Sequence, residues 1–197
     1  MPLRVSRAIA VSKLPSASSS SHMKQVAIFC SASNKIDPKF NAAAREVVRA
    51  LHALGYGVVS GGGKRGTMGA ITDESVHVLG HHVAVLPRYM DGMENPDVTR
   101  VVWTDTMSTR KTCMREDTCA AIALPGGIGT LDEVIETLVL RKLGRYPGQV
   151  LALNLDGYYE PLKALLDHYV AYGMMEPQDR ELMQFPTTVE ELIAFFK

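Results

Sequence analysis

The sequence predicts an α/β protein with one parallel, doubly wound β-sheet and helices on both of its faces. Two observations support this fold class. From Met23 onward, short apolar and β-branched runs alternate with stretches whose apolar residues recur at helical spacing. Such alternation is typical of parallel sheets in which helices connect successive strands. With 197 residues, the chain is long enough for one compact domain with a large core. We therefore expect a single Rossmann-like domain.

The first elements follow this pattern. KQVAIFC (24–30) is a β-rich run that predicts the first strand, and a loop follows it. The next stretch, FNAAAREVVRALHALG (40–55), has helical apolar spacing and ends on Gly55, which suits a C-cap. YGVVS (56–60) predicts the second strand, and the glycine-rich turn after it opens a helix that extends to about Leu79.

The middle of the chain continues the alternation. Two strands are expected at HHVAVLP (81–87) and TRVVWT (99–104), followed by a helix over 108–118. CAAIAL (119–124) is short and wholly apolar, as expected for a strand that is buried on both faces. A long helix is expected over 130–143.

The last elements are a strand at QVLALNL (149–155), a helix at YEPLKALLDHYVAYG (159–173) and a short tail, TVEELIAFF. The first 22 residues stand apart, because they are rich in serine and contain no acidic residue. Their ending, SSSSHM, favours a disordered extension or a tag (1–22), with a transit-like presequence as the alternative. We expect the functional domain to occupy residues 23–197.

Composition excludes several classes of function. The 21 basic and 21 acidic residues balance, so the chain has no electrostatic footprint for nucleic acid. No apolar run approaches the ~20 residues of a membrane span. The three cysteines (Cys30, Cys113 and Cys119) are odd in number and lack metal-type spacing, which favours a reduced, cytoplasmic setting. We expect no metal and no cofactor.

Two glycine-rich loops follow predicted strands, SGGGKRGTMG (60–69) and PGGIGT (125–130). In doubly wound sheets, ligands bind at the carboxyl ends of the strands, where these loops are placed. Glycine lets backbone N–H groups approach an anion, and each loop opens into a helix whose N-terminus attracts negative charge. A tight turn is the alternative for either loop alone, but the two together predict a phosphate site.

The first loop also fits a dinucleotide-binding motif. Gly61, Gly63 and Gly66 satisfy G-x-G-x-x-G, the fingerprint of nicotinamide-binding folds. That fingerprint expects an acidic residue at the end of the next strand, but the strand here ends in LPR (86–88). Neither loop contains the Gly-Lys-Ser/Thr of a P-loop. A nicotinamide-dependent oxidoreductase is therefore disfavoured.

One carboxylate and one basic pair are candidates for chemistry. Glu133 closes TLDE (130–133), which has the spacing of a capping box, so helix capping is the first alternative to catalysis. Asp132 beside it suits the helix dipole. MSTRKTCM (107–114) places an Arg-Lys pair between two methionines. A solvated basic face with methionines as core filler is the alternative there.

Four segments together resemble the LOG ("Lonely guy") family in order and spacing: KQVAIFCSASN (24–34), SGGGKRGTMG (60–69), MSTRKTCM (107–114) and PGGIGTLDE (125–133). The resemblance covers about residues 24–196, and its most specific motifs are P-G-G-x-G-T-x-x-E and R-K-x-x-M. The family comprises cytokinin riboside 5'-monophosphate phosphoribohydrolases, formerly labelled lysine decarboxylases. No lysine here stands out as a pyridoxal anchor.

The resemblance implies hydrolysis of the N-glycosidic bond of a nucleoside 5'-monophosphate to free base and ribose 5-phosphate, with Arg110 and Glu133 as the catalytic pair. A carboxylate suits the oxocarbenium-like charge that develops on the ribose, and an arginine fork suits a phosphate or sugar. The residues implied in phosphate binding are Gly126, Gly127, Gly129 and Thr130, with Gly62 and Gly63 on the opposite wall and Lys111 as a further candidate. The resemblance also implies a homodimer with a shared active site, and we expect helix 134–143 to form the contact.

The chain departs from the family pattern after the second motif. Members commonly read T-W-A-Q-L-G-x-H-x-K-P, whereas this chain reads VLRKLGRYP (139–147), with Leu140 in place of the tryptophan. In the first glycine loop, Thr67 stands where leucine is usual. These differences leave the base open, so adenylate or another nucleotide is an alternative substrate. A non-catalytic nucleotide-sensing module remains the alternative function, although it needs neither Arg110 nor Glu133.

Overall fold

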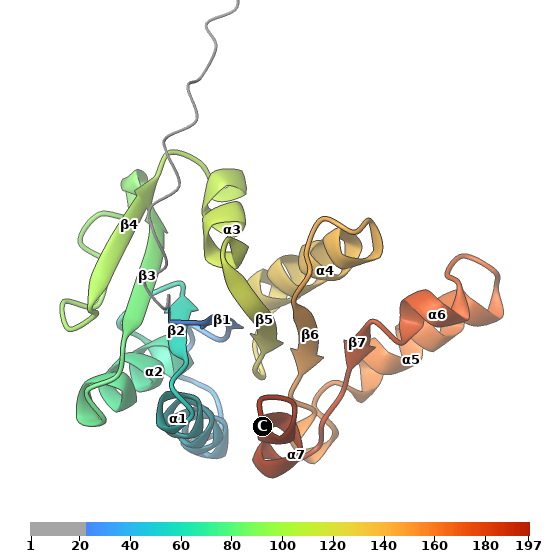
Figure 1. The fold of residues 1–197 in the computed structure, drawn as a ribbon, viewed down its shortest axis with the longest axis horizontal. Helices are drawn as coiled ribbons and strands as arrows, with labels where there is room; N and C mark the ends of the chain where they lie inside the picture. Colours follow the sequence, from blue (N-terminus) through green and yellow to red (C-terminus); the bar gives the residue numbers. More distant parts are fainter. Residues whose placement is uncertain (1–22) are drawn as a thin grey trace, which may run out of the picture.

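The structure, a computed structural model, describes residues 23–197, so the expectation for residues 1–22 lies outside the described part. Seven strands form one sheet in the order β4-β3-β2-β1-β5-β6-β7, and each neighbouring pair is parallel (Figure 1). The strands are β1 (Gln25–Phe29), β2 (Gly57–Ser60), β3 (His82–Pro87), β4 (Arg100–Thr104), β5 (Thr118–Ala123), β6 (Gln149–Ala152) and β7 (Met183–Gln184).

Helices join the strands and cover the sheet. The helices are α1 (Pro38–Ala53), α2 (Gly66–His77), α3 (Met107–Arg115), α4 (Ile128–Lys142), α5 (Glu160–Ala171), α6 (Pro177–Arg180) and α7 (Val189–Ala194). Two 3₁₀ turns lie at Arg88–Met90 and Leu155–Gly157.

Each face of the sheet has its own hydrophobic core, as the central strand β1 shows. Val26 and Ile28 pack with residues of α1, α2 and α7, whereas Ala27 and Phe29 pack with residues of α3, α4 and α5. Successive side chains of a strand point to opposite faces, so one apolar run serves both cores. The arrangement confirms the predicted doubly wound α/β fold with helices on both faces.

The path of the chain places the candidate site. From β1 the chain moves outward through β2 and β3 to β4, and it then returns to β5 on the other side of β1. Such a reversal opens a crevice at the carboxyl ends of the central strands, which is where ligands bind in this architecture. The loops that follow β1, β2 and β5 meet there.

The expected strands are all present with shifted ends, and the structure adds elements, among them the helix α7 in the expected tail. The two-residue strand β7 and the four-residue helix α6 have no counterpart in the sequence prediction. The helix expected over 108–118 is shorter, because α3 ends at Arg115 and Thr118 already begins β5. Gly55 directly follows the α1 cap residue with a φ of +83°, as expected for a helix-terminating glycine.

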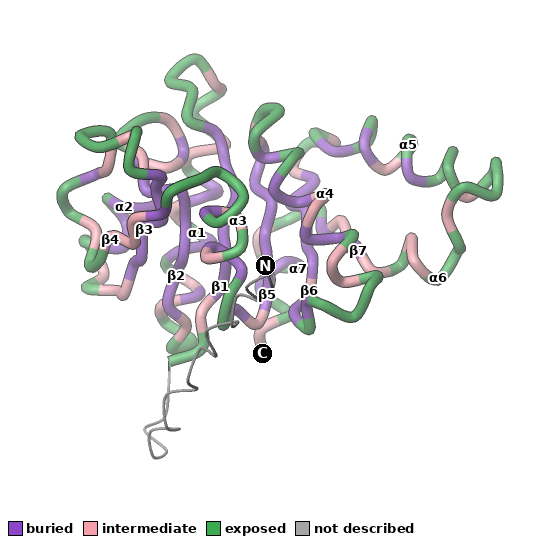
Figure 2. The backbone as a smooth tube through the Cα atoms, turned by 90° about the horizontal axis from the view of Figure 1, so that it is seen from above, coloured by how far each residue is buried: buried purple, intermediate pink, exposed green. Residues whose placement is uncertain are grey.

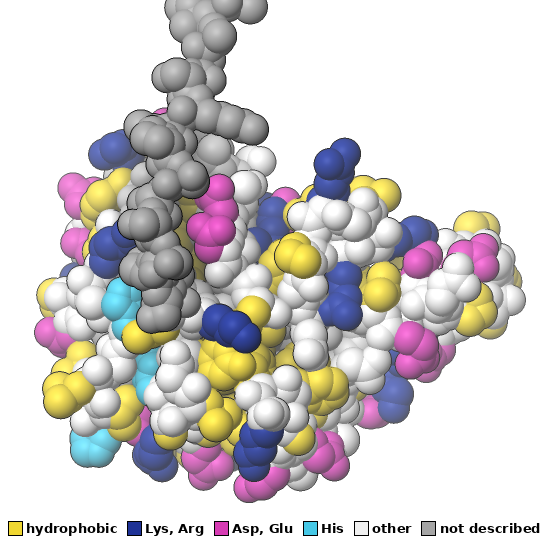
Figure 3. All heavy atoms as spheres, viewed as in Figure 1, with side chains coloured by type: hydrophobic (Ala, Val, Ile, Leu, Met, Phe, Trp, Pro, Cys, Tyr) yellow, Lys and Arg dark blue, Asp and Glu magenta, His cyan; other side chains and the backbone are white. Residues whose placement is uncertain are grey.

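The surface agrees with the balanced composition. Figure 2 shows buried residues along the central strands, whereas α5 and α6 extend beyond the sheet with much of their length exposed. On the face drawn in Figure 3, basic and acidic side chains are interspersed. Between Met23 and Lys197, no helix has the length and apolar character needed to cross a membrane.

Candidate active site

A cavity of about 410 Å³ lies at the carboxyl edge of the sheet. Five segments that are far apart in the sequence line it: the loop after β1, the first turn of α2, the 3₁₀ turn after β3, the helix α3 and the first turns of α4. Its lining includes Ser31, Ala32, Ser33, Met107, Arg110, Gly127, Gly129, Thr130 and Glu133. A second hollow of about 350 Å³ shares four of the cavity's lining residues (Ala32, Met68, Met90 and Arg110).

Arg110 is buried at the junction of α3, β3 and α4. Its Nε donates to the Val85 carbonyl at 2.9 Å, and its Nη1 donates to Oε1 of Glu133 at 2.7 Å. Only 6% of the residue is exposed. The alternative of a solvated basic face is therefore wrong for Arg110. Two hydrogen bonds hold its planar guanidinium in one orientation at the cavity wall.

Glu133 does not cap the helix. The α4 N-cap is Gly127 and no side chain caps this end, so Thr130 is the third helical residue and Glu133 the sixth. The expectation of a helix start at residue 130 is wrong, and with it the capping-box reading of TLDE. The Glu133 carboxylate instead faces Arg110 across the cavity wall, and 6% of the residue is exposed.

Burial changes the protonation of this site. It raises the pKa of the Glu133 carboxyl above its ordinary value, and the Arg110 guanidinium opposes that shift. Cys30, which also lines the cavity, has a thiol whose pKa is raised by burial. A carboxyl with a raised pKa beside a cavity is suited to exchanging a proton with a bound molecule.

The first turn of α4 forms the floor of the cavity. At Gly127 and Gly129 a Cβ atom would meet nothing within 4 Å, so these glycines leave the helix N-terminus open to a ligand. At Gly126 a Cβ would overlap the Thr130 side chain, so glycine is needed there for packing. The Thr130 hydroxyl is buried beside it and has no hydrogen-bond partner among residues 23–197.

The first glycine loop takes a different orientation from the one expected. Gly62 has a φ of +65° and is turned toward the sheet, where a Cβ would overlap Ala84 of β3. Gly63 lines the second hollow, as does Gly61. A Cβ on Gly61 would overlap the guanidinium of Arg110, so Gly61 makes room for that side chain. The resemblance pointed to Gly62 and Gly63 for this wall, but the glycine that contacts the Arg110 guanidinium is Gly61.

Lys111 lies outside the cavity. Its Nζ forms ion pairs with Asp132 at 3.0 Å and with Glu136 on the next turn of α4. These contacts raise the pKa of Lys111, with the Glu136 hydrogen bond as the largest cause. Lys111 therefore ties α3 to α4 at the mouth of the site.

Sequence reasoning missed the serine loop after β1 and the methionines of the cavity wall. Ser31, Ala32 and Ser33 reach the cavity because β1 ends at the reversal of strand order. Their position after the central strand was the available signal. Met107 is 41% exposed beside the cavity, whereas Met114 is fully buried, so only the second is core filler.

Residues 68–196 match a protein family described as "Possible lysine decarboxylase". Relatives with full names extend the match. "Cytokinin riboside 5'-monophosphate phosphoribohydrolase LOG3" of Arabidopsis thaliana is 33% identical over 88% of this chain and 81% of its own length. "Probable cytokinin riboside 5'-monophosphate phosphoribohydrolase LOGL2" of Oryza sativa subsp. japonica is 35% identical over 88% of this chain and 72% of its own length. The chain belongs to the LOG family.

The LOG fold is shared with more distant solved structures. A molybdenum cofactor binding protein from Rippkaea orientalis superposes with a TM-score of 0.69 at 17% identity, covering 89% of this chain and 96% of its own. The molybdenum cofactor carrier protein of Chlamydomonas reinhardtii gives a TM-score of 0.69 at 17% identity, with 88% and 96% covered. At this identity the likeness concerns the fold.

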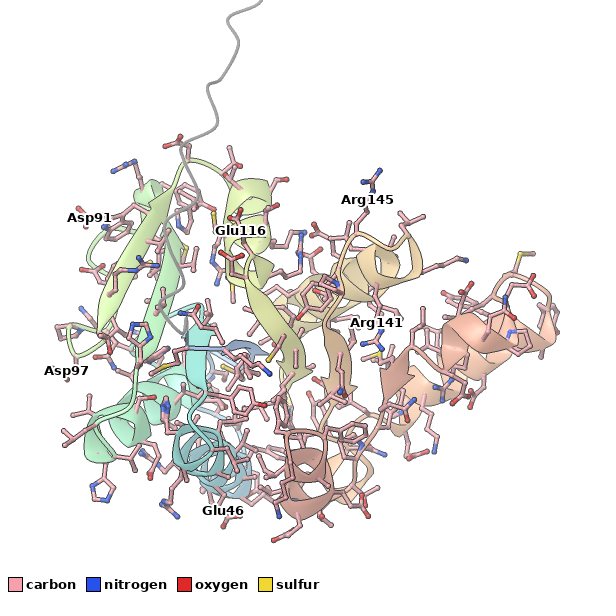
Figure 4. The ribbon with its side chains drawn as sticks, in the orientation of Figure 1. Glu46, Asp91, Asp97, Glu116, Arg141 and Arg145 are labelled. Atoms are coloured by element: carbon pink, nitrogen blue, oxygen red, sulfur yellow. The ribbon has the colours of Figure 1, made fainter. Side chains whose placement is uncertain are left out.

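Neither departure from the common LOG pattern belongs to the lining of this chain's own cavity. VLRKLGRYP (139–147) forms the last turn of α4 and the loop after it, where Arg141 and Arg145 lie in Figure 4. A helix rises ~1.5 Å per residue, so this segment is roughly 20 Å from the glycines at the start of α4. Thr67 is buried, and its hydroxyl donates to Asn41 at 3.1 Å.

Proposed function

We propose that this chain hydrolyses the N-glycosidic bond of a nucleoside 5'-monophosphate and releases the free base and ribose 5-phosphate. The observation that carries the proposal is the buried Arg110–Glu133 pair, 2.7 Å apart, on a cavity floored by the open N-terminus of α4. The names of the LOG relatives support the same activity. The cavity volume of about 410 Å³ is within the usual range for small-molecule sites.

The 5'-phosphate is assigned to the first turn of α4. The N–H groups there have no intrahelical partner, and the helix dipole favours negative charge at this end. Gly127 and Gly129 leave room for phosphate oxygens to approach the backbone. The unpartnered Thr130 hydroxyl offers a further hydrogen bond, to a phosphate oxygen or a bridging water.

Glu133 and Arg110 are assigned to the ribose. As the C1'–N bond breaks, the base leaves with the bonding electrons and positive charge develops on the sugar, which an adjacent carboxylate stabilises. Water then bonds to C1' and gives up a proton to Glu133, whose raised pKa suits it to pass that proton on to the ring nitrogen of the departing base. Arg110 orients the carboxylate and offers its remaining N–H groups to the sugar or phosphate.

A homodimer with a shared active site is part of the proposal. One side of α4 carries Ile128, Leu131, Ile135 and Val139 at helical spacing, and Leu143 continues the row. Ile128 is 87% and Leu143 62% exposed, which is unusual for such a continuous apolar row on a monomer. A second copy of the chain on this row would stand directly beside the cavity mouth. We also propose a cytoplasmic location, in keeping with three free thiols.

The test is a panel of nucleoside 5'-monophosphates, including AMP and a prenylated AMP, incubated with the full chain. Free base and ribose 5-phosphate are measured by chromatography, and adenosine serves as the substrate that lacks the phosphate. We expect release from at least one monophosphate, and far slower release from adenosine. Equal rates on AMP and adenosine would contradict the phosphate assignment. Binding of AMP without release of any base would favour the nucleotide-sensing alternative.

A further inference from the structure

Two consecutive tyrosines hold the P-G-G turn from outside the cavity. The Tyr158 hydroxyl donates to the Gly126 carbonyl, and the Tyr159 hydroxyl donates to the Leu124 carbonyl, both at 2.7 Å. The two carbonyls lie on either side of Pro125. We propose that Tyr158 and Tyr159 form a clamp that positions the N-terminus of α4 for the phosphate, with Tyr158 as the residue that orients the Gly127 N–H. The inference rests on the proposed function and adds two positioning residues to it.

The turn needs such donors because the sheet no longer supports it. The last carbonyl of β5 is that of Ala123, which accepts from Leu153 N–H at 2.9 Å, and Leu124 N–H donates to Phe29 at 2.9 Å. Beyond that point the chain leaves the sheet, and Pro125 has no N–H to donate. The tyrosine hydroxyls therefore replace the sheet hydrogen bonds for two of the next three carbonyls, those of Leu124 and Gly126.

Peptide geometry connects Tyr158 to the phosphate site. In a trans peptide the C=O group and the following N–H lie in one plane and point in opposite directions. A bond from Tyr158 that fixes the Gly126 carbonyl thus fixes the Gly127 N–H on the opposite side of the chain. Gly127 lines the cavity and Tyr158 lies outside its lining. In the proposed clamp, the Gly127 N–H points away from Tyr158 and toward the cavity.

The tyrosines are themselves held in place. The Tyr158 ring makes edge contacts with Phe40 of α1, 5.4 Å between centroids, and with the Tyr159 ring at 5.1 Å. Tyr159 N–H donates to the Asn154 side chain at 2.7 Å, and Asn154 in turn donates to Glu160 at 2.6 Å. Each hydroxyl is thus fixed before a ligand binds, which is what a positioning residue requires.

A purely structural role explains Tyr159 better than Tyr158. Tyr159 is 6% exposed and belongs to the hydrophobic core under α4 and α5. Tyr158 is 41% exposed and lies outside both cores, so its burial contributes little. The hydrogen bond to Gly126 is therefore the main consequence of having tyrosine at position 158.

The experiment compares Tyr158→Phe with Tyr146→Phe in the full chain. Tyr146 is the matched control, because its buried hydroxyl bonds Thr118 at the start of β5, the opposite end of that strand. Calorimetry measures the affinity for AMP, ribose 5-phosphate and adenosine. We expect Tyr158→Phe to bind both phosphate-bearing ligands about three- to tenfold more weakly, the scale of one lost hydrogen bond. Adenosine binding and kcat should change little, while the KM for AMP should rise by the same factor.

Several results would contradict the clamp. Unchanged AMP affinity in folded Tyr158→Phe, or an equal loss for AMP and adenosine, would overturn the clamp. So would a wild-type chain that binds no phosphate-bearing ligand. If the wild type binds AMP but releases no base, the proposed function fails while the Tyr158 comparison still tests the clamp. Should Tyr158→Phe not fold, Phe40→Leu replaces it in the experiment. This variant keeps the Tyr158 hydroxyl but removes the ring that packs against Tyr158, so AMP should bind more weakly. An unchanged AMP affinity in Phe40→Leu would reject the clamp.

Discussion

The Arg110–Glu133 pair puts opposite charges in contact in the interior, where the removal of one partner leaves the other uncompensated. Breaking such a buried pair costs about 3–5 kcal/mol of stability, so alanine substitutions would confuse folding with catalysis. A neutral residue of the same shape separates the two effects.

Glu133→Gln keeps the size of the side chain and can still accept a hydrogen bond from Arg110. It can neither stabilise positive charge on the ribose nor take a proton from water. We therefore expect a folded protein whose turnover falls by at least about a hundredfold, the usual scale for a positioned acid–base group. AMP affinity should fall much less, because the α4 amides are untouched. Near-normal turnover in the folded variant would remove Glu133 from the chemistry.

The raised pKa of Glu133 predicts a pH dependence. Turnover that needs the carboxylate should decline as the pH falls through a pKa above the ordinary value of about 4.3. For stability, the folded state keeps this proton at pH values where the unfolded chain has released it. The stabilisation that comes from this bound proton is therefore complete below the pKa of Glu133 in the unfolded chain. It is lost as the pH rises through the pKa of Glu133 in the folded protein. The melting temperature of the wild type relative to Glu133→Gln should fall over that window, and a flat difference would contradict the shift.

At the scale of elements, the start of α4 shows why the site was only partly predictable. The fold followed from the alternation of apolar runs, and the motifs pointed to Arg110 and Glu133, whose side chains meet at the cavity. The spacing TLDE imitates a capping box, so the helix start was misplaced, because a glycine N-cap leaves no side-chain signal. β7 was missed because a two-residue strand is too short to show a period. The contact of Gly61 with Arg110 depends on packing between distant segments, which spacing does not encode.

Replacement by alanine should change protein stability in opposite directions at Gly126 and Gly129, two glycines at the start of α4. Gly129→Ala adds a methyl group where there is open space and improves helix propensity, so the protein should be stabilised by up to about 1 kcal/mol. The methyl group would occupy space that we propose for the phosphate, so AMP affinity should fall nonetheless. Gly126→Ala forces overlap with Thr130 and should lower the melting temperature. Both variants are measured by thermal unfolding and by AMP titration. A destabilised Gly129→Ala would contradict the open space at position 129.

At the scale of the whole molecule, the exposed row on α4 predicts self-association. Val139→Glu introduces a charge into this row, where Val139 is 48% exposed, and should shift the protein from dimer to monomer. Leu79→Glu is the control, because Leu79 is 93% exposed near the end of α2, away from α4. Sedimentation at several concentrations measures both. A wild type that sediments as a monomer at every concentration would reject the dimer.

The boundary at residue 23 gives a second prediction at this scale. The described cores consist of residues from Val26 onward, so deletion of residues 1–22 should leave the melting temperature and turnover unchanged. Both are measured on the shortened chain beside the full one. Loss of folded protein after the deletion would place the boundary earlier in the chain.

The position of β1 between β2 and β5 also has a consequence for synthesis. β2, the first partner of β1, follows it closely in the sequence, but the second partner of Ile28, Ile122 of β5, is made only after more than half the chain. Long-range parallel pairing of this kind is slow, and domains complete it as units. A nascent chain stalled before β5 therefore exposes one edge of its central strand, and it holds Arg110 without Glu133. Such a chain offers an unpaired strand edge to chaperones or to other copies, and its Arg110–Glu133 ion pair forms only when α4 has been translated.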